Sequence, residues 1–376
     1  MRNPSTVYLS NVGPHIIVDR GTETEIARVL DHVALVKPNF ITVMGGARFT
    51  QAVEIGQELL TNERFDPQPR IILRKWPDDG NWKKPQYKDP DKWFEENQHL
   101  IEQGFLLKAS NEDNEMDLTN MSHWLARQVH LAGSIGQGVA VGSFATGNPH
   151  ESQFSFDPKT RKGQMTPLAE ALHIWHDYSI YAPHEYVALS HNRTAGHPFR
   201  YKQFWNMCDA LELERPTTVI GEHGLLVNMD PYKGWKLVDF DGGREYYEFL
   251  KPFNKQWYLP HGVDLQIFSY LEWDKTPSIH VDEAFMVALE VDAMGNQLIN
   301  RSPQIIKQKK ELPDYVEEPE PEPEPKPEPD PGPQERIKEL VINLDFLKEV
   351  KSDRIPDEIR IQFIYKEEND GSDSST

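Results

Sequence analysis

Two glutamates in this sequence stand where a carboxyl group could take part in a reaction. Glu112 follows Asn111 after the apolar stretch 104–107, and Glu222 lies in the stretch Gly221-Glu222-His223-Gly224 after the apolar stretch 216–220. Two carboxyl groups at one site can share bond cleavage, because one stays protonated and donates its proton while the other is ionised and attacks carbon. Double displacement at a sugar requires the pair to be about 5–5.5 Å apart. The fold must therefore bring the ends of these two stretches together.

Both glutamates fit a repeating pattern of short apolar stretches separated by amphipathic ones. The stretches that we predict to be strands are residues 7–10 (continuing toward 16–18), 40–44, 70–73, 105–107, 139–143, 186–189, 217–220 and 265–269. The pattern between them predicts helices over residues 23–36, 91–103, 118–132, 166–178, 202–213 and 244–259. Strands that alternate with helices pair in parallel through right-handed crossovers.

Eight such units in about 270 residues match the size of a (β/α)8 barrel, so we predict an α/β chain with a TIM-barrel fold. An open doubly wound sheet is the alternative. That fold usually has fewer strands and often a glycine-rich phosphate loop, and the sequence has neither GxGxxG nor GxxxxGK[ST]. In a barrel the active site lies at the carboxyl ends of the strands, so Glu112 would close strand four and Glu222 strand seven.

Asn111-Glu112 after strand four, with a glutamate after strand seven, resembles the pattern of clan A, a large clan of retaining glycoside hydrolases with a (β/α)8 barrel. The resemblance implies that Glu112 is the acid/base, that Glu222 is the nucleophile, and that Asn111 hydrogen-bonds the 2-hydroxyl of the sugar. The Gly-Glu-His-Gly setting of Glu222 is similar to the family's Thr-Glu-aromatic-Gly. The implied substrate is an oligo- or polysaccharide with β-glycosidic bonds, and no cofactor is implied.

Other residues at predicted strand ends fit the same resemblance. Many clan members have a His or Tyr after strand six that faces the nucleophile, and a Trp after strand eight that forms the floor of the sugar site. His191 and Trp273 match these positions. Arg48 after strand two, and Arg74 with Trp76 after strand three, are candidates to orient the nucleophile or line the groove. The alternative for each is a structural role, in a surface loop or in the core.

Two features depart from the family pattern. Asp113 stands where proline commonly follows Asn-Glu, and its charge would tend to raise the pKa of Glu112. The residues after His191 do not follow the His-Glu-Tyr pattern of related bacterial and phage barrels, which leaves the subfamily and the sugar open. The alternative function is therefore a catalytically inactive barrel that binds a glycan or a protein as a module of a larger assembly.

Other catalytic classes have weaker support in the sequence. No HExxH motif or clustered Cys/His set is present, so we predict no metal, although His15, His191 and His223 could converge at a barrel mouth. There is no GxSxG motif for a serine nucleophile. Cys208 is the only cysteine, so no intrachain disulfide can form, and its helix-like setting indicates a buried thiol.

Charge and hydropathy limit the partners. The chain has 376 residues and a net charge of −20, much of it beyond residue 311, which argues against nucleic acid or an anionic membrane as a partner. No apolar run reaches the length of about 18 residues that spans a membrane. The start, MRNPSTVYLS, has no apolar segment of a signal peptide. We expect a location in the cytoplasm, or release without a signal peptide, for example with a phage.

The composition also predicts the domain boundaries. Residues 1–310 form the expected barrel, and residues 311–333 form an acidic Pro-rich linker whose like charges and prolines favour an extended spacer. Residues 334–366 form a small β or α/β segment, in which EIRIQFIY alternates as a strand does, while ELVINLDFL fits a helix or a strand. This segment is a candidate for self-association or for attachment to an assembly. Residues 367–376 have the composition of a disordered tail.

Overall fold

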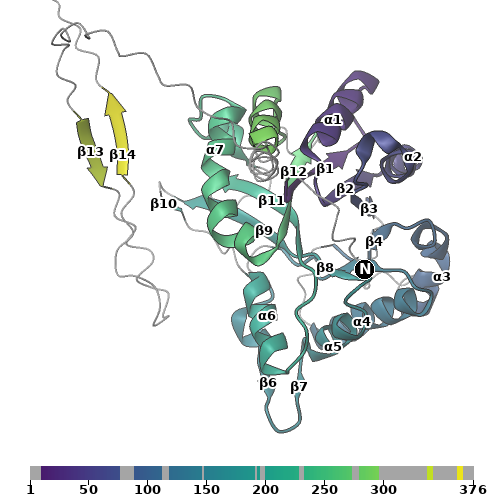
Figure 1. Cartoon of the computed structure of the whole chain (residues 1–376). Coiled ribbons are helices and arrows are strands. Elements are labelled where there is room, and N and C mark those ends of the chain that lie inside the picture. The colour runs from purple at the N-terminus through teal and green to yellow at the C-terminus, as the bar shows by residue number, and fades with distance from the viewer. Residues whose placement is uncertain are drawn as a thin grey trace, which may run out of the picture. The chain divides into compact units, whose positions relative to one another are not determined.

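The computed structural model describes residues 10–76, 89–111, 118–145, 148–190, 193–194, 200–227, 233–272, 279–295, 337–341 and 362–366 (Figure 1). The chain divides into two compact units, Met1–Glu311 and Leu312–Thr376. In the second unit, β13 (Ile337–Val341) pairs in antiparallel fashion with β14 (Gln362–Lys366). β14 lies in the stretch predicted as a strand, and β13 takes up the start of the ambiguous stretch ELVINLDFL as a strand.

Ten of the described strands in the first unit form one curled, mostly parallel sheet. They are β1 (Val12–Ile17), β2 (Phe40–Gly45), β3 (Arg70–Lys75), β4 (Leu106–Lys108), β5 (Val139–Val141), β8 (Ile180–Tyr181), β9 (His184–Ser190), β10 (Arg193–Thr194), β11 (Val219–Val227) and β12 (Asp264–Tyr270). Their order is β10-β9-β11-β12-β1-β2-β3-β4-β5-β8. Every pairing is parallel except that of β9 with β10, as the alternation of strands and helices predicts.

Hydrogen bonds join the β8 end of this order to β11. β8 pairs with β5, and Tyr181 at its end forms a parallel bridge with Thr218, the residue directly before β11. The Tyr181 amide donates to the carbonyl of Thr217 at 3.0 Å. β9 then pairs with β11 over six residues, beginning with Glu222 opposite His184. β8 and β9 are therefore consecutive parts of one strand position, separated by Ala182 and Pro183.

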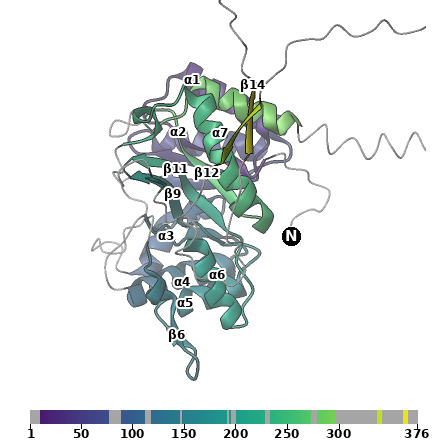
Figure 2. The same ribbon diagram turned by 90° about the vertical axis from the view of Figure 1, so that its left-hand side faces the viewer.

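The helices alternate with these strands and lie around the outside of the sheet in both views (Figures 1 and 2). They are α1 (Glu23–Val36), α2 (Phe49–Thr61), α3 (Pro90–Ile101), α4 (Leu118–Ser134), α5 (Thr166–Ile174), α6 (Arg200–Ala210) and α7 (Gly243–Phe253), and residues 283–295 are also helical. A short hairpin of β6 (Phe156–Asp157) and β7 (Lys162–Gly163) projects away from the helices in both figures.

Local sequence signals explain where two of the helices begin. Thr22 caps α1 through a capping box, in which its hydroxyl accepts from the Glu25 amide while the Glu25 carboxylate accepts from the Thr22 amide. Asp89 caps α3 by accepting from the amide of Asp91, and Pro90 occupies the first helical position, where no amide hydrogen is needed.

Two helices, α2 and the one at residues 283–295, are absent from the elements predicted from the sequence. Gly56 in the middle of α2 weakens its helix propensity. The fold needs this glycine, because a Cβ at position 56 would lie 2.6 Å from the ring of Phe105. The close packing of α2 on the sheet therefore requires a glycine, and this glycine makes the helix harder to predict from the sequence.

Strands six and seven extend beyond their predicted ends. The stretch predicted as strand six began at Tyr186, but β9 begins at His184 and β8 precedes it. Strand seven was predicted to end at Ile220, but β11 continues through Val227, so that prediction was wrong. The polar stretch 221–224 resembles a turn in the sequence, yet its backbone groups pair with β9 and stay extended. Glu222 therefore lies within a strand.

The side chains enclosed by the sheet form a polar layer between two apolar ones. The first apolar layer holds Phe40, Ile72, Leu106, Ala140, Ile180, Ala182 and Val219. The second holds Ile17, Met44, Tyr186, Leu226, Phe268 and Ile279, with Trp76 packed against it. Residues between these layers along the strands include Thr42, Arg74, Lys108, His184 and Glu222, all of them buried. Alternation along each strand thus directs this set of polar side chains to the inside of the sheet.

An extra residue in β11 sets the direction of Glu222. In the ladder with β12, Ile220 pairs with Leu265 and His223 pairs with Ile267, so three steps along β11 match two along β12. Such a bulge inserts a residue and redirects the side chains that follow it. Ile220 belongs to the core between strands and helices, and His223 lines a cavity beside α7. Glu222 between them faces the inside.

Candidate active site

The carboxylate of Glu222 is surrounded by hydrogen-bond donors on both oxygens. Arg74 Nη1 donates to Oε1, and Lys108 Nζ lies 3.8 Å from the same atom. The Tyr186 hydroxyl donates to Oε2 at 2.8 Å, and His184 Nδ1 lies 3.4 Å from it. These four residues come from β3, β4 and β9, so the curled sheet brings together side chains from distant parts of the chain.

Charge at this site holds Glu222 ionised. Its side chain is buried, with 6% of the residue exposed, and burial alone would raise its pKa. The charges of Arg74 and Lys108, together with the His184 Nδ1 that lies beside the carboxylate, outweigh burial, so the pKa of Glu222 lies well below its ordinary value. A carboxylate that is ionised at any physiological pH can act as a nucleophile and cannot act as a proton donor.

Lys108 connects Glu222 to two further polar side chains. Its ammonium lies 2.9 Å from His184 Nε2 and 3.1 Å from Asn111 Oδ1. An ammonium group only donates, so Nε2 of His184 accepts, and the proton of a neutral imidazole lies on Nδ1, facing Glu222. The Asn111 carbonyl likewise accepts from Lys108, and its amide group is oriented as a donor.

His15 forms another wall of the site from β1. Its Nδ1 lies 3.2 Å from the carbonyl oxygen of Gly221, and its ring meets Phe268 edge-on at 4.9 Å. Burial lowers the pKa of His15 well below its ordinary value, so the ring is neutral at pH 7. It therefore contributes shape and a dipole beside Glu222, and no full charge.

Among the predicted site residues that the structure describes, Arg74 and Asn111 belong to the network around Glu222, and Arg48 does not. Arg74 contacts Glu222, and its guanidinium also lies over the Trp76 ring, 5.4 Å from the centroid. Asn111 meets Lys108 as above. Arg48 is elsewhere in the fold: its guanidinium donates to the carbonyls of Gly21 and Val18, at 2.8 and 3.3 Å, and holds the loop between β1 and α1. Of the predicted site residues, Glu112, His191 and Trp273 lie outside the described residues.

Sequence reasoning did not single out Lys108, His184 or Tyr186 for this site. Two signals pointed to them. Lys108 is a cation directly after the apolar residues 105–107, where a solvated side chain is not expected. The His-Glu-Tyr sequence that is missing after His191 is present at residues 184–186, ahead of the stretch assigned to strand six. In a strand, its first and third residues face the same side, as His184 and Tyr186 do here.

Other chemistry considered from the sequence has no site among the described residues. His15 and His223 do not converge, because His15 faces Glu222 and His223 faces the helix side of β11. No group of three or more His, Cys, Asp or Glu in the described ranges could hold a metal. Cys208 is fully buried in α6, as expected, and burial raises the pKa of its thiol to about 12. No helix among the described ranges combines the length and apolar character needed to cross a bilayer.

Comparison with known proteins finds structural likeness and no match of sequence. No family model and no curated protein sequence matches the chain. Among solved structures, the chain is similar to the catalytic domain of a mannanase from Streptomyces sp. SirexAA-E, with 12% sequence identity and a TM-score of 0.43. The match covers 77% of this chain and 91% of the mannanase domain.

Proposed function

We propose that this chain is a retaining glycoside hydrolase on a (β/α)8 barrel, with Glu222 as the nucleophile and Glu112 as the acid/base. The observation that carries the proposal is the buried carboxylate of Glu222, kept ionised by Arg74, Lys108 and His184. Such an arrangement suits attack on an anomeric carbon, because the carboxylate needs no base to activate it. The order of the strands in the sheet supports the barrel, because β8 and β9 together occupy the sixth strand position.

In the proposed first step, Glu222 forms a bond to the anomeric carbon as the glycosidic C–O bond breaks. The leaving oxygen takes a proton from Glu112, so a glycosyl ester of Glu222 and a free alcohol result. In the second step, Glu112 accepts a proton from water, the water oxygen bonds to the anomeric carbon, and the ester breaks to restore the Glu222 carboxylate. The configuration of the sugar is retained because it is inverted twice.

Arg74 and Tyr186 would act on the charge of Glu222 during these steps. Both donate to its oxygens, which orients the attacking lone pair toward the sugar. They also stabilise the carboxylate as the ester breaks in the second step, when negative charge returns to it. Asn111, with its carbonyl fixed by Lys108, would present its amide donor to the 2-hydroxyl.

A mechanism-based label tests the assignment directly. 2-Deoxy-2-fluoro-β-glycosides with a dinitrophenolate leaving group, in the gluco, manno, xylo and galacto series, should trap the ester and raise the protein mass by one fluoroglycosyl group. Peptide mapping should place the label on Glu222, and Glu222→Gln should take up none. Glu290→Gln is a matched control, because Glu290 is also a buried carboxylate, paired with Arg28 and His32, outside the site.

The same experiment identifies the alternatives. A label on any residue other than Glu222 would overturn the role assigned to it. Reducing ends released by the wild type from β-glucans, mannans, xylans, galactans or peptidoglycan would give the substrate. Glycan binding without turnover or labelling, unchanged in Glu222→Gln, would instead identify an inactive glycan-binding barrel.

A further inference from the structure

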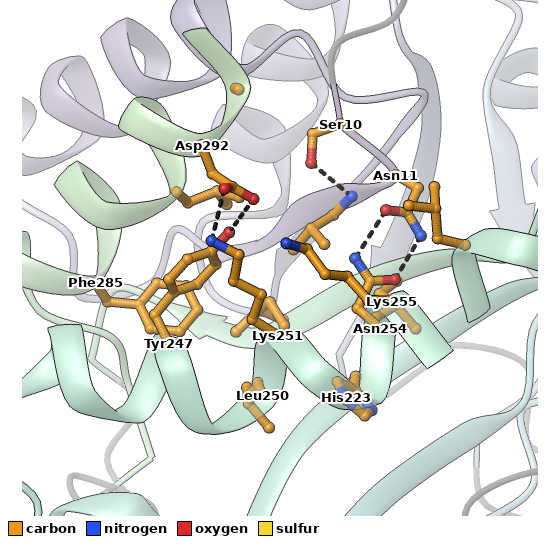
Figure 3. A pocket seen from close by; sticks show the side chains of 16 residues that line it. Ser10, Asn11, His223, Tyr247, Leu250, Lys251, Asn254, Lys255, Phe285 and Asp292 are labelled. Atoms are coloured by element: carbon orange, nitrogen blue, oxygen red, sulfur yellow. Dashed lines mark hydrogen bonds and ion pairs between the residues drawn. The ribbon is translucent and has the colours of Figure 1, made fainter. Parts of the chain in front are cut away.

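A second site lies on the opposite side of β11 from Glu222. A cavity of about 100 Å³ is enclosed by the strands, by α7 and by the helix at residues 283–295 (Figure 3). Its apolar walls include Val12, Leu250, Ile267, Phe285 and Leu289, each of them buried. The cavity is separate from the candidate active site, because adjacent residues of β11 face opposite sides of the sheet.

His223 gives this apolar cavity one polar atom without a partner. The ring lines the cavity and is fully buried. Its Nδ1 lies 2.7 Å from the carbonyl oxygen of Glu185, which can only accept, so Nδ1 carries the proton and Nε2 is an acceptor. Nε2 has no hydrogen-bond partner among the described residues. Burial lowers the pKa of His223 to about 4, so the ring stays neutral and Nε2 remains an acceptor at pH 7.

Two pairs of polar groups beside the cavity satisfy each other, as Figure 3 shows, while the exposed Lys255 also lines it. Lys251 and the Tyr247 hydroxyl both donate to Asp292, at 2.7 and 2.9 Å. Asn11 and Asn254 exchange amide hydrogen bonds at 2.7 and 2.9 Å. His223 Nε2 is a fully buried polar atom of the lining without a partner among the described residues, and a guest molecule could pair with it. An unpaired buried acceptor costs free energy that a donor inside the cavity would recover.

Size and chemistry together define the guest. A dry apolar cavity of about 150 Å³ in another protein takes up benzene, so a cavity of about 100 Å³ suits a six-membered ring or a smaller branched group. We infer that this cavity binds a small, uncharged apolar molecule with a single hydrogen-bond donor, of the phenol or short-alcohol class. The donor pairs with His223 Nε2, and the apolar body lies against Leu250, Ile267 and Leu289.

Phenol and toluene form a matched pair of probes, because they have nearly the same shape and only phenol donates a hydrogen bond. The full chain, with labelled Leu, Ile and Val methyl groups, would be titrated with each compound and followed by NMR. Phenol should cause saturable shifts at Val12, Leu250, Ile267 and Leu289. Phenol should bind about 3- to 10-fold more tightly than toluene, the range expected for one net hydrogen bond. The ¹⁵N resonance of His223 Nε2 should move on addition of phenol and stay unchanged with toluene.

Two variants separate the cavity from binding elsewhere. His223→Phe removes the acceptor, so phenol should lose its advantage over toluene. Ala293→Leu adds a side chain to the cavity wall and should abolish the shifts from both compounds. The inference fails if toluene binds the wild type as well as phenol does, or if no saturable shift occurs because water alone occupies the cavity. Shifts that persist in Ala293→Leu would also overturn it. None of these outcomes depends on glycosidase activity.

Discussion

Lys108 Nζ lies 2.9 Å from Nε2 of His184, and this contact places the proton of a neutral imidazole on Nδ1, the nitrogen near Glu222. The lysine therefore acts on the carboxylate twice, through its own charge at 3.8 Å and through the tautomer of His184. Lys108 is a buried cation, and removing a charge from water costs free energy. Its cost is offset by the interactions it makes with the polar layer.

Replacing Lys108 tests that double role. Lys108→Met should lower kcat/KM about 10- to 100-fold, the effect of losing a charged hydrogen bond inside the protein. It should also raise the pKa of Glu222, which moves the acid limb of the pH–rate profile upward. The ¹⁵N shifts of His184 should show loss of the Nδ1–H tautomer, a change that a purely structural role would not produce. Lys108→Arg should keep the charge, and an unchanged tautomer in Lys108→Met would contradict the account.

A substitution at Tyr186 removes a single hydrogen bond to the other carboxylate oxygen of Glu222, Oε2. Tyr186→Phe removes a hydrogen bond of 2.8 Å and keeps the ring that meets Phe268 edge-on. We expect kcat/KM to fall about 10-fold with little change in thermal stability. Tyr246→Phe is the matched control, since that buried hydroxyl accepts from the Leu225 amide on the helix side of β11. Equal losses of activity in the two variants would show that Tyr186 has no special relation to Glu222.

If Glu112 is the acid/base, the activity of a Glu112 variant should depend on the leaving group of the substrate. Glu112→Ala should slow cleavage of unactivated glycosides about 10²- to 10⁴-fold, the usual contribution of a general acid, and should spare formation of the ester from dinitrophenyl glycosides. Azide should rescue this variant and give the β-glycosyl azide, because it attacks the glycosyl ester of Glu222. With Glu222→Ala, azide should give the α-glycosyl azide. The stereochemistry of the two products, read by NMR, distinguishes acid/base from nucleophile, and identical products would refute the assignment.

Buried neutral histidines should make the fold sensitive to mild acid. The pKa of His223 is lowered to about 4 in the fold, whereas an unfolded histidine titrates near 6.5. Between these values the unfolded chain binds a proton that the native chain does not, so stability falls as pH drops from about 6.5 to about 4. The loss from this residue is at most roughly 3 kcal/mol. Urea unfolding at several pH values should show a shallower pH dependence for His223→Phe than for the wild type. The exposed His123→Gln should match the wild type.

One glycine in α4 should behave against its helix propensity. Glycine to alanine inside a helix normally stabilises by about 1 kcal/mol. A Cβ at Gly133, however, would lie 2.1 Å from the Trp175 ring, which is held by a hydrogen bond of 3.0 Å from its Nε1 to His130. We expect Gly133→Ala to destabilise the fold by about 1–3 kcal/mol because of overpacking. Chemical denaturation beside Ser134→Ala, an exposed neighbour on the same helix, measures the difference, and a gain in stability would show that the ring can move.

Much of the fold could be predicted from the sequence because the strand signals are local. Apolar stretches of four to eight residues alternate with amphipathic ones, and this pattern alone indicates a parallel sheet with helices outside it. Glu222 could be found by the same logic, since it interrupts an apolar stretch together with glycines. The bulge in β11 could not be predicted from the sequence. The inserted residue becomes visible only when the residues of β11 are matched with their partners in β12.

The partners of Glu222 were harder to predict for a physical reason. Lys108 is the last residue of β4 and His184 is the first residue of β9, and a rule that follows only apolar stretches leaves both outside the predicted strands. Their burial depends on one another, as Lys108 contacts His184 and both lie near Glu222. Burial of each polar residue becomes favourable only when the fold brings these distant strands together. No short stretch of the sequence therefore predicts it.

The pairing of Glu222 with His184 in the β9–β11 ladder has a consequence for how accurately the chain must assemble. A slip by one residue would turn Glu185 toward the carboxylate and His184 away from it, because neighbouring residues face opposite sides. Such a chain could retain much of its secondary structure while the site was lost. The carbonyl of Pro183, which accepts from the Gly221 amide at 2.8 Å, fixes the ladder at the residue before His184. Correct strand register is thus a condition of the chemistry, and a population of misregistered molecules would be inactive while still compact.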